Sequence, residues 1–379
     1  MFIGQGRPYE AIPHNESFSS ATLDKEELMH LNDLGYYEAI DHYRDQHDLG
    51  SFDIARVLAE HKERYVIQTS QLELEAEITG NLRFSAKERT DFPAVGDWVA
   101  VSVFDDQMAI IHQVLPRKSM LRRRAVGKFG EQQIIATNID YAFIVMAVDR
   151  DYNLNRLERY LTLCYDGDVT PILLLSKIDL IPGEALQSKE QKIKQGHPSM
   201  RVIPFSNTTR QGHTEIKSLI QPGRTYCVIG SSGVGKSTLT NWLTGKDLVK
   251  TGAISESTQK GKHVTSHREL FILDQGGLLI DTPGMREVGI MENVEKAFDT
   301  IQALSGQCKY NNCTHTQEDG CAILEALEEG MITPEAYGNY IKMQREAERI
   351  QASIAEKRKK DRAFGKMYKE FKKHNKREG

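Results

Sequence analysis

A glycine-rich loop near the middle of the chain constrains the fold more than any other stretch. It has the form G-x-x-x-x-G-K-[ST] followed by a threonine, and its residues are Gly230, Ser231, Ser232, Gly233, Val234, Gly235, Lys236, Ser237 and Thr238. The preceding residues 224–229 predict a buried strand, and residues 238–243 predict a helix. In that context backbone N–H groups turn inward around phosphates, Lys236 reaches the β- and γ-phosphates, and the Ser237 hydroxyl ligates Mg²⁺. The alternative is a turn that merely caps a helix, and the combined pattern strongly favours a nucleotide site.

Composition indicates a soluble protein of several domains. At 379 residues the chain has room for two or three of them. Nothing near the N-terminus resembles a signal peptide, and no apolar run is long enough to span a bilayer, so we expect no membrane association. Five cysteines, three of them clustered, indicate a reducing compartment and a metal site instead of a disulfide framework.

The first third of the chain changes from a helical to a strand-like pattern. Residues 1–60 are predicted to form a helical extension. Leu28, Leu31 and Leu34 form the apolar face of its helix, and Gly35 marks the C-terminal end of that helix. Residues 61–125 predict a β-barrel of about five strands, of the oligonucleotide/oligosaccharide-binding (OB) type, from short β-rich runs at 65–67, 72–78, 98–103 and 108–114. A basic stretch adjoins the barrel and either contacts a polyanion or is a solvated linker. Its residues are Arg117, Lys118, Arg122, Arg123, Arg124 and Lys128.

Residues 126–300 alternate between strand and helix patterns. The apolar run at 141–148 is typical of a parallel strand buried on both faces, and further strands are predicted at 171–175 and 202–205. Two more runs, 270–273 and 278–281, predict an antiparallel pair. A helix between the first two strands has the apolar stripe Leu157, Tyr160, Leu161 and Cys164. The pattern predicts a doubly wound nucleotide-binding sheet.

Base selection is predicted directly after the strand at 171–175. Ser176-Lys177-Ile178-Asp179 stands where GTPases carry N-K-x-D. A carboxylate at Asp179 accepts hydrogen bonds from the paired N1–H and N2–H₂ donors of guanine, which adenine lacks. Lys177 would cover the face of the base. Ser176 replaces the usual Asn, so we expect its stabilising amide contact to be lost or altered.

Two further segments are predicted to contact the γ-phosphate and Mg²⁺. Asp281-Thr282-Pro283-Gly284 matches D-x-x-G, in which Asp281 would hold Mg²⁺ through water and the Gly284 N–H would meet the γ-phosphate. A plain β-turn is the alternative for this sequence. A switch loop is expected within residues 261–267, where Thr265 is the best candidate for a Mg²⁺ ligand. Because base recognition precedes the phosphate loop, the GTPase order is circularly permuted, which the proximity of domain termini permits.

Three cysteines and a histidine lie within fourteen residues and predict a metal centre. Their pattern is Cys308-x4-Cys313-x-His315-x5-Cys321. Three thiolates and one imidazole complete a tetrahedral Zn²⁺ site, so the metal is structural and not catalytic. Three buried free cysteines would be the alternative, and the clustering argues against it. Cys164 and Cys227 lie in apolar patterns and are predicted to be core residues.

The C-terminal residues 301–379 predict zinc-binding helices followed by a basic tail. A helix is expected at 323–327, and Thr333-Pro334-Glu335 predicts the start of another. From Glu356 onward there are 11 Lys/Arg against 4 Asp/Glu, a net charge of 11 − 4 = +7. The aromatic residues Phe364, Tyr368 and Phe371 are interleaved, which favours RNA binding over a solvated tail.

The barrel, the permuted GTPase order and the Cys-Cys-His-Cys module together resemble the ribosome small-subunit-dependent GTPase A family. The resemblance covers roughly residue 64 to the C-terminus. It implies a cytoplasmic GTPase that acts late in small-subunit assembly, with GTP/GDP, Mg²⁺ and one structural Zn²⁺, and with a barrel that contacts ribosomal RNA. It also implies that the backbone of Ser206 contacts the guanine oxygen, although Asn207 replaces the usual Ala. Val264 stands where the family usually has Thr.

The sequence therefore predicts a GTP-hydrolysing assembly factor, monomeric, whose partners are the small ribosomal subunit and its rRNA. A nucleotide-gated RNA-binding scaffold with incidental hydrolysis is the first alternative. An ATP-dependent kinase is the second, and Asp179 argues against it. Met285 follows Gly284 where Ras-like GTPases have a water-orienting Gln, so we expect slow intrinsic turnover. His263, and after it His267, are the candidates to hold the attacking water.

Overall fold

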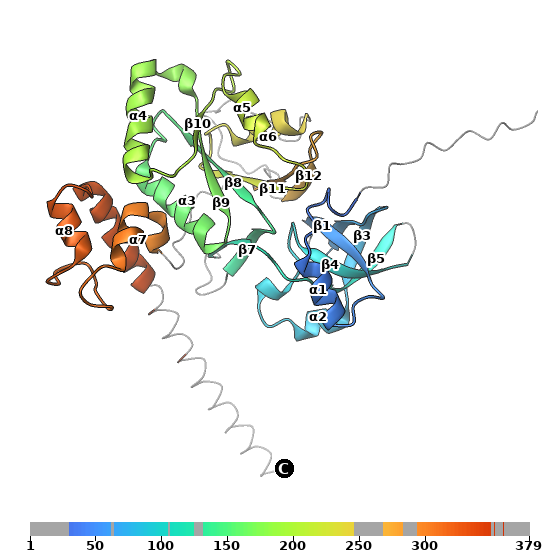
Figure 1. Cartoon of the computed structure of the whole chain (residues 1–379). Coiled ribbons are helices and arrows are strands. Elements are labelled where there is room, and N and C mark those ends of the chain that lie inside the picture. Colours follow the sequence, from blue (N-terminus) through green and yellow to red (C-terminus); the bar gives the residue numbers. More distant parts are fainter. Residues whose placement is uncertain are drawn as a thin grey trace, which may run out of the picture.

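Three folded units follow one another along the chain in the computed structural model (Figure 1). The structure describes residues 30–61, 64–104, 107–124, 132–245, 268–282 and 294–349, together with residues 352 and 359. In Figure 1 the barrel and the C-terminal helices lie on opposite sides of the central sheet. None of the described helices is long and apolar enough to cross a membrane.

The first unit is a closed five-stranded barrel. Its strands are β1 (Asp53–His61), β2 (Arg64–Gln68), β3 (Glu73–Ile78), β4 (Trp98–Val103) and β5 (Met108–Val114). They pair in the order β1-β2-β3-β5-β4, β4 returns to β1, and only β3 and β5 pair in parallel. Helix α2 (Gly80–Ser85) and the short helix η1 (Arg89–Asp91) lie between β3 and β4. This arrangement confirms the predicted OB-type barrel.

The start of the barrel differs from the prediction. Strand β1 lies largely within residues 1–60, which were expected to be a helical extension. Six consecutive residues of β1 are buried, so it lacks the alternation of apolar and polar residues that marks a half-exposed strand. The described part of the helix expected to end at Gly35 is not helical, and residues 31–35 form turns instead. The first helix, α1, comes later, at Ala39–Gln46. Leu34 is nevertheless fully buried.

The second unit is the predicted doubly wound sheet. Its strands are β8 (Tyr141–Ala147), β9 (Thr170–Ser176), β10 (Val202–Pro204), β11 (Thr225–Gly230), β12 (Glu269–Ile272) and β13 (Leu278–Asp281). The order is β10-β9-β8-β11-β13-β12, in which all neighbours are parallel except β12 and β13. The helices are α3 (Leu154–Asp166), η2 (Ile178–Leu180), α4 (Gly183–Gly196), α5 (His213–Ser218) and α6 (Lys236–Thr244).

Alternate residues of β8 enter different cores, as expected for a central strand. Ile144 shares one core with Leu161 of α3, and Val145 shares the other with Ile216 of α5. The sheet is therefore covered on both faces, and the carboxyl ends of its parallel strands form a single edge. Cys164 and Cys227 are fully buried, as predicted for core residues.

A two-stranded ribbon and a strand pairing join the barrel to the sheet. The ribbon consists of β6 (Met120–Arg124) and β7 (Gln132–Thr137), so part of the basic stretch is strand instead of linker. Strand β1 pairs with β12 at Ala59 and Glu269, which makes the barrel and the nucleotide-binding sheet continuous.

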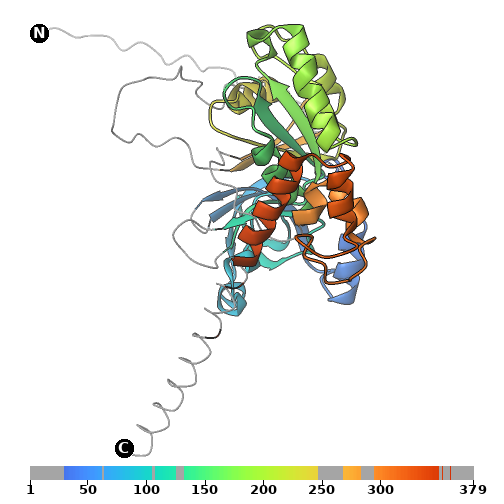
Figure 2. The same ribbon diagram turned by 90° about the vertical axis from the view of Figure 1, so that its left-hand side faces the viewer.

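The third unit is helical and packs against α3. It contains η3 (Val294–Ala297), α7 (Asp299–Ser305), α8 (Ala322–Glu328) and a helix over residues 334–349. The Thr333 hydroxyl accepts a hydrogen bond of 3.2 Å from the Ala336 N–H, which confirms the predicted helix start. Arg159 of α3 pairs with Glu346 at 2.7 Å across this contact. The view in Figure 2 turns this side of the molecule toward the reader.

Candidate nucleotide site and metal centre

The phosphate loop connects β11 to α6 at the carboxyl edge of the sheet. Gly230, Gly233 and Gly235 have φ values of 144°, 82° and 99°, a region that only glycine adopts without strain. A side chain at Gly230 is also excluded by space, because its Cβ would lie 2.3 Å from the carbonyl oxygen of Val145. The glycines are therefore required where the loop turns its backbone N–H groups inward.

Lys236 and Asp281 place opposite charges beside this loop. The Lys236 ammonium is buried and donates a hydrogen bond to the Ser231 carbonyl. Burial lowers the pKa of Lys236 to about 8, against the opposing effects of Asp281 and Asp151. Burial also raises the pKa of Asp281, which Lys236 opposes. A buried cation at the start of a helix attracts phosphate oxygens, and a carboxylate facing it suits a divalent cation.

The segment after β9 lies next to the phosphate loop. The Ser176 hydroxyl donates to the Val234 carbonyl at 2.6 Å, and Lys177 pairs with Asp149 at 2.9 Å. Asp179 accepts a hydrogen bond of 2.5 Å from the Ser206 hydroxyl. Ser176 thus makes a hydrogen bond to the phosphate loop, although it lacks the side-chain amide of the usual Asn.

Asn207 supplies a second connection between the two loops. Its amide nitrogen donates to the Gly235 carbonyl at 3.0 Å. A Cβ on Gly235 would lie 2.6 Å from that same nitrogen, so the contact depends on glycine. Together Ser176 and Asn207 hold the segments that would bind base and phosphate in a fixed relation. Such preorganisation lowers the cost of binding one ligand at both ends.

The three cysteines and His315 converge in the C-terminal unit. Their four potential ligand atoms all lie within 4.8 Å of one another. The His315 Nδ1 is 3.5 Å from the Sγ atoms of both Cys308 and Cys321, and these two sulfurs are 3.9 Å apart. Zn–S and Zn–N bonds of about 2.3 and 2.0 Å in a tetrahedron give edges of about 3.5–3.8 Å, close to these three separations, so the cluster is compatible with Zn²⁺.

The surroundings of the cluster hold its loop in place. The Glu318 carboxylate accepts hydrogen bonds of 2.9, 3.0 and 3.1 Å from the backbone N–H groups of Thr314, Thr316 and Gln317. The Tyr337 hydroxyl donates to the His315 carbonyl at 2.8 Å and ties the loop to the last helix.

Comparisons with known proteins match most of the chain. The family model described as RsgA GTPase matches residues 114–291. The protein named "Small ribosomal subunit biogenesis GTPase RsgA 2" of Lactiplantibacillus plantarum is 41% identical over 315 residues, covering 82% of this chain and 89% of that protein. The chain belongs to the RsgA GTPase family. A second RsgA, from Opitutus terrae, is 40% identical over 305 residues, covering 77% of this chain and 83% of the relative.

Solved structures agree with the fold. The structure titled "YjeQ from Thermotoga maritima" has a TM-score of 0.60 at 23% identity, over 78% of this chain and 98% of that one. The structure titled "YloQ, a circularly permuted GTPase" also has a TM-score of 0.60 at 23% identity. The match covers 80% of this chain and 97% of that one. The chain thus has the circularly permuted order predicted from its motifs. A model described as ABC transporter also matches residues 214–371. That match includes the phosphate loop, which is common to both classes, but not Asp179.

Several predicted RsgA site residues lie outside the described residues. They are His263 and Thr265 of the expected switch loop, His267 beside them, and Gly284 and Met285 after β13. The described part of D-x-x-G is Asp281-Thr282, where the Thr282 hydroxyl donates to the Val228 carbonyl. This hydrogen bond fixes the end of β13 against the phosphate-loop strand.

Two residues near the candidate nucleotide site were not predicted. Asp149 follows β8 at the carboxyl edge and pairs with Lys177, and its place after a buried parallel strand was a usable signal. Tyr160 of α3 forms a side-chain hydrogen bond with Ser231 of the phosphate loop. The sequence shows Tyr160 only as one member of an apolar helix stripe, which gives no sign of this contact.

Proposed function

We propose that this protein is a GTPase that acts in the assembly of the small ribosomal subunit. The observation that carries the nucleotide assignment is the pair of hydrogen bonds from Ser176 and Asn207 to the phosphate loop, which sets Asp179 at a fixed place relative to Lys236. Membership of the RsgA family supports the ribosomal role.

Guanine selectivity is assigned to Asp179. One of its oxygens accepts from Ser206, and a carboxylate has further lone pairs for the N1–H and N2–H₂ groups of guanine. Lys177 covers the base, and residues 230–238 surround the phosphates. The Ser206 N–H donates to the Gln211 carbonyl at 3.0 Å, so it is not free for the expected contact with the guanine oxygen. Asp179→Asn exchanges an acceptor for a donor and should weaken GTP binding by about 2–4 kcal/mol.

The test is a titration with fluorescent GTP and ATP analogues. Asp274→Asn, at an exposed carboxylate in the turn between β12 and β13, serves as the matched control and should bind GTP like the wild type. Equal affinity of the wild type for ATP and GTP would rule out the assignment.

Two metals complete the proposal. Ser237, Asp281 and Thr265 would hold Mg²⁺, which would supply positive charge beside the β- and γ-phosphates. Cys308, Cys313, His315 and Cys321 hold one structural Zn²⁺. The distances among the cysteine and histidine donors support the zinc site. The buried Lys236 and Asp281 support the nucleotide site, because the first suits phosphate oxygens and the second suits a divalent cation.

Hydrolysis is proposed to depend on the ribosomal subunit. Met285 cannot orient water by hydrogen bonding, so the isolated protein should turn over slowly. When the protein docks on the subunit, His263 orients the attacking water, and the Gly284 N–H contacts the γ-phosphate. GTP turnover should rise strongly with small subunits in the wild type and fail to rise in His263→Ala.

The measurement compares turnover with and without purified small subunits, using His42→Ala, an exposed histidine on α1 outside the barrel strands, as a control. Fast turnover in the absence of subunits would contradict the gating. Normal stimulation in His263→Ala would exclude this histidine.

RNA contact is assigned to the barrel and the basic tail of a monomeric, cytoplasmic factor. Truncation after Ala355 removes a net charge of +7 and should weaken subunit binding and flatten its dependence on salt concentration. The scaffold alternative, in which GTP acts by occupancy, predicts that a hydrolysis-deficient protein still supports subunit maturation. An unchanged salt slope would show that the tail is only solvated.

A further inference from the structure

A cavity of about 210 Å³ lies between the nucleotide-binding unit and the C-terminal helical unit of residues 294–349, which is called the zinc unit below. Glu158 of α3 and His197, which follows α4, line one side. Phe298, Ile332, Glu335 and Asn339 line the other side, from the C-terminal unit. None of these residues belongs to the nucleotide site or to the metal centre, so the cavity has no assigned role.

Two of the side chains that line this cavity each have one buried polar atom without a hydrogen-bond partner in the described part of the chain. Glu158 and His197 are each 4% exposed, and the atoms are Glu158 Oε2 and His197 Nδ1. Asn339 donates to the Glu158 carboxyl, which leaves Oε2 available. Buried polar atoms in folded proteins are nearly always hydrogen-bonded, so two such atoms at one cavity mark a site for a polar ligand.

The chemistry of the lining identifies the kind of ligand. The buried Glu158 of α3 and the exposed Glu335 of the C-terminal unit both line the cavity, and an ionised carboxylate only accepts hydrogen bonds. The wall between them is largely apolar, formed by Leu154, Phe298, Ile301, Ile332 and Ala336. The volume is below the range of about 300–1,000 Å³ typical of drug-sized ligands. A fitting ligand is thus small, cationic and aliphatic.

We propose that this cavity binds a short aliphatic diamine, with one ammonium group at Glu158 and the other toward Glu335. Such a ligand would contact α3 and the C-terminal unit at once and would strengthen the joint between them. Its methylene chain would cover the apolar wall. Lys192 also lines the cavity, but its side chain is exposed and can turn to solvent.

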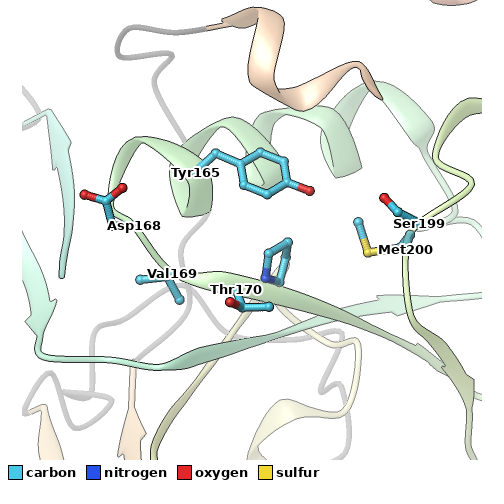
Figure 3. Close-up of a pocket in the computed structure, with 7 residues that line it drawn as sticks. Tyr165, Asp168, Val169, Thr170, Ser199 and Met200 are labelled. Carbon is cyan, nitrogen blue, oxygen red and sulfur yellow. The ribbon is translucent and has the colours of Figure 1, made fainter. Parts of the chain in front are cut away.

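A neighbouring hollow lacks these features. It measures about 400 Å³ and is lined by Tyr165, Asp168, Val169, Thr170, Pro171, Ser199 and Met200 (Figure 3). It lies at the amino end of β9, whereas ligands of such sheets bind at the carboxyl ends. The Ser199 hydroxyl already donates to Asp299 at 2.7 Å. We therefore assign the ligand to the Glu158 cavity alone.

Ionisation of Glu158 should couple to binding. Burial raises the pKa of Glu158 to about 8, Asn339 and Arg159 lower it, and Glu335 raises it further. His197 faces it with a pKa lowered by burial, which Asp299 opposes, and Lys192 faces it from α4. Below pH 8 an ammonium ligand must displace the Glu158 proton. The apparent affinity should therefore rise with pH up to about 8, with proton release on binding.

The experiment is isothermal titration of the full-length protein with 1,4-diaminobutane, in buffers of different ionisation enthalpy at pH 6.5, 7.5 and 8.5. We expect one saturable site, with proton release at the lower pH values. Glu158→Gln should weaken binding at least tenfold, and 1,4-butanediol should bind at least tenfold more weakly than the diamine. Glu184→Gln, on α4 but not at the cavity, should bind like the wild type.

A second variant tests the location without removing charge. Ala336→Met extends a side chain into the cavity and should abolish binding, while circular dichroism and thermal unfolding show that the variant is folded. No saturable binding to the wild type, as for a cavity filled only by water, would overturn the proposal. Unchanged binding in folded Glu158→Gln and Ala336→Met, or an affinity that falls as the pH rises from 6.5, would also overturn it.

Discussion

The two joints that flank the nucleotide-binding unit bury charge in different ways. At the joint with the barrel, Arg56 is fully buried, and its guanidinium donates to the carbonyls of Leu34, Gly96 and Asn138 and to the Thr225 hydroxyl. At the joint with the zinc unit, the equally inaccessible Glu158 and His197 each have an atom without a partner among the described residues. The degree of burial is similar, but the hydrogen bonding is not.

This difference predicts which joint is rigid. The barrel joint combines the Arg56 hydrogen bonds with the pairing of β1 and β12, so several independent contacts fix one geometry. The zinc-unit joint has the Arg159–Glu346 ion pair, the Ser199–Asp299 hydrogen bond and the Asn339–Glu158 hydrogen bond, and these surround a cavity. A joint with a cavity and unsatisfied groups opens at lower cost, so we expect relative motion of the zinc unit and little motion of the barrel.

Removal of zinc should have the largest effect and should be confined to one side of the molecule. So small a unit has a limited core, and structural zinc contributes about 10–16 kcal/mol in isolated zinc-finger peptides. Cys313→Ser should lose the metal and unfold the C-terminal helices, while GTP binding is largely retained. Metal analysis and limited proteolysis measure both outcomes.

Cys164→Ala provides the control for this experiment. It also changes a cysteine, but one buried in the core of the sheet, so the zinc content should stay at one equivalent. A full equivalent of zinc in Cys313→Ser would contradict the metal centre.

Loss of the Arg56 guanidinium should have the next largest effect. Arg56→Met keeps much of the apolar volume but leaves buried carbonyls unpaired, and we expect the free energy of unfolding to fall by about 3–5 kcal/mol. Denaturant unfolding of barrel and sheet together measures the loss. Arg64→Met, on the exposed side of β2, should change it by less than about 1 kcal/mol. Equal effects of both variants would show that the barrel joint is not held by Arg56.

The sequence predicted the joints less well than the units. The five parallel strands were predicted from apolar runs, and Asp179 and the Cys308, Cys313, His315 and Cys321 cluster from short spacings, because these signals are local. Arg56 was missed because its partners lie 22 to 169 positions away in the chain. Likewise, nothing in a helix stripe shows that Glu158 is buried, since its neighbours come from the C-terminal unit. Contacts between units depend on docking, which no local pattern encodes.

Neutralising Glu158 should stabilise the zinc-unit joint at alkaline pH. Its pKa in the folded protein is about 8, above its ordinary value, so the folded state binds more protons than the unfolded state between about pH 4.5 and 8. Stability is therefore lost as the pH rises through this window. Glu158→Gln should remove that loss and gain about 2–3 kcal/mol at pH 8, because each pH unit contributes about 1.4 kcal/mol at most.

Thermal unfolding at pH 5 and pH 8 measures this effect. The two proteins should be similar at pH 5 and should separate at pH 8, with Glu184→Gln following the wild type at both. A wild type more stable at pH 8 than Glu158→Gln would mean that the carboxylate is satisfied, and the contrast between the joints would fail.

The ion pair at the same joint should have the smallest effect. Arg159 and Glu346 form two hydrogen bonds of 3.1 and 2.7 Å, but their side chains remain 27% and 36% exposed. Solvent screens such a pair, so a double-mutant cycle with Arg159→Met and Glu346→Gln should give a coupling of about 0.5–1 kcal/mol that shrinks with added salt. A coupling of about 3 kcal/mol, insensitive to salt, would make this joint as firmly held as the one at Arg56. The zinc unit would then move only together with the nucleotide-binding sheet.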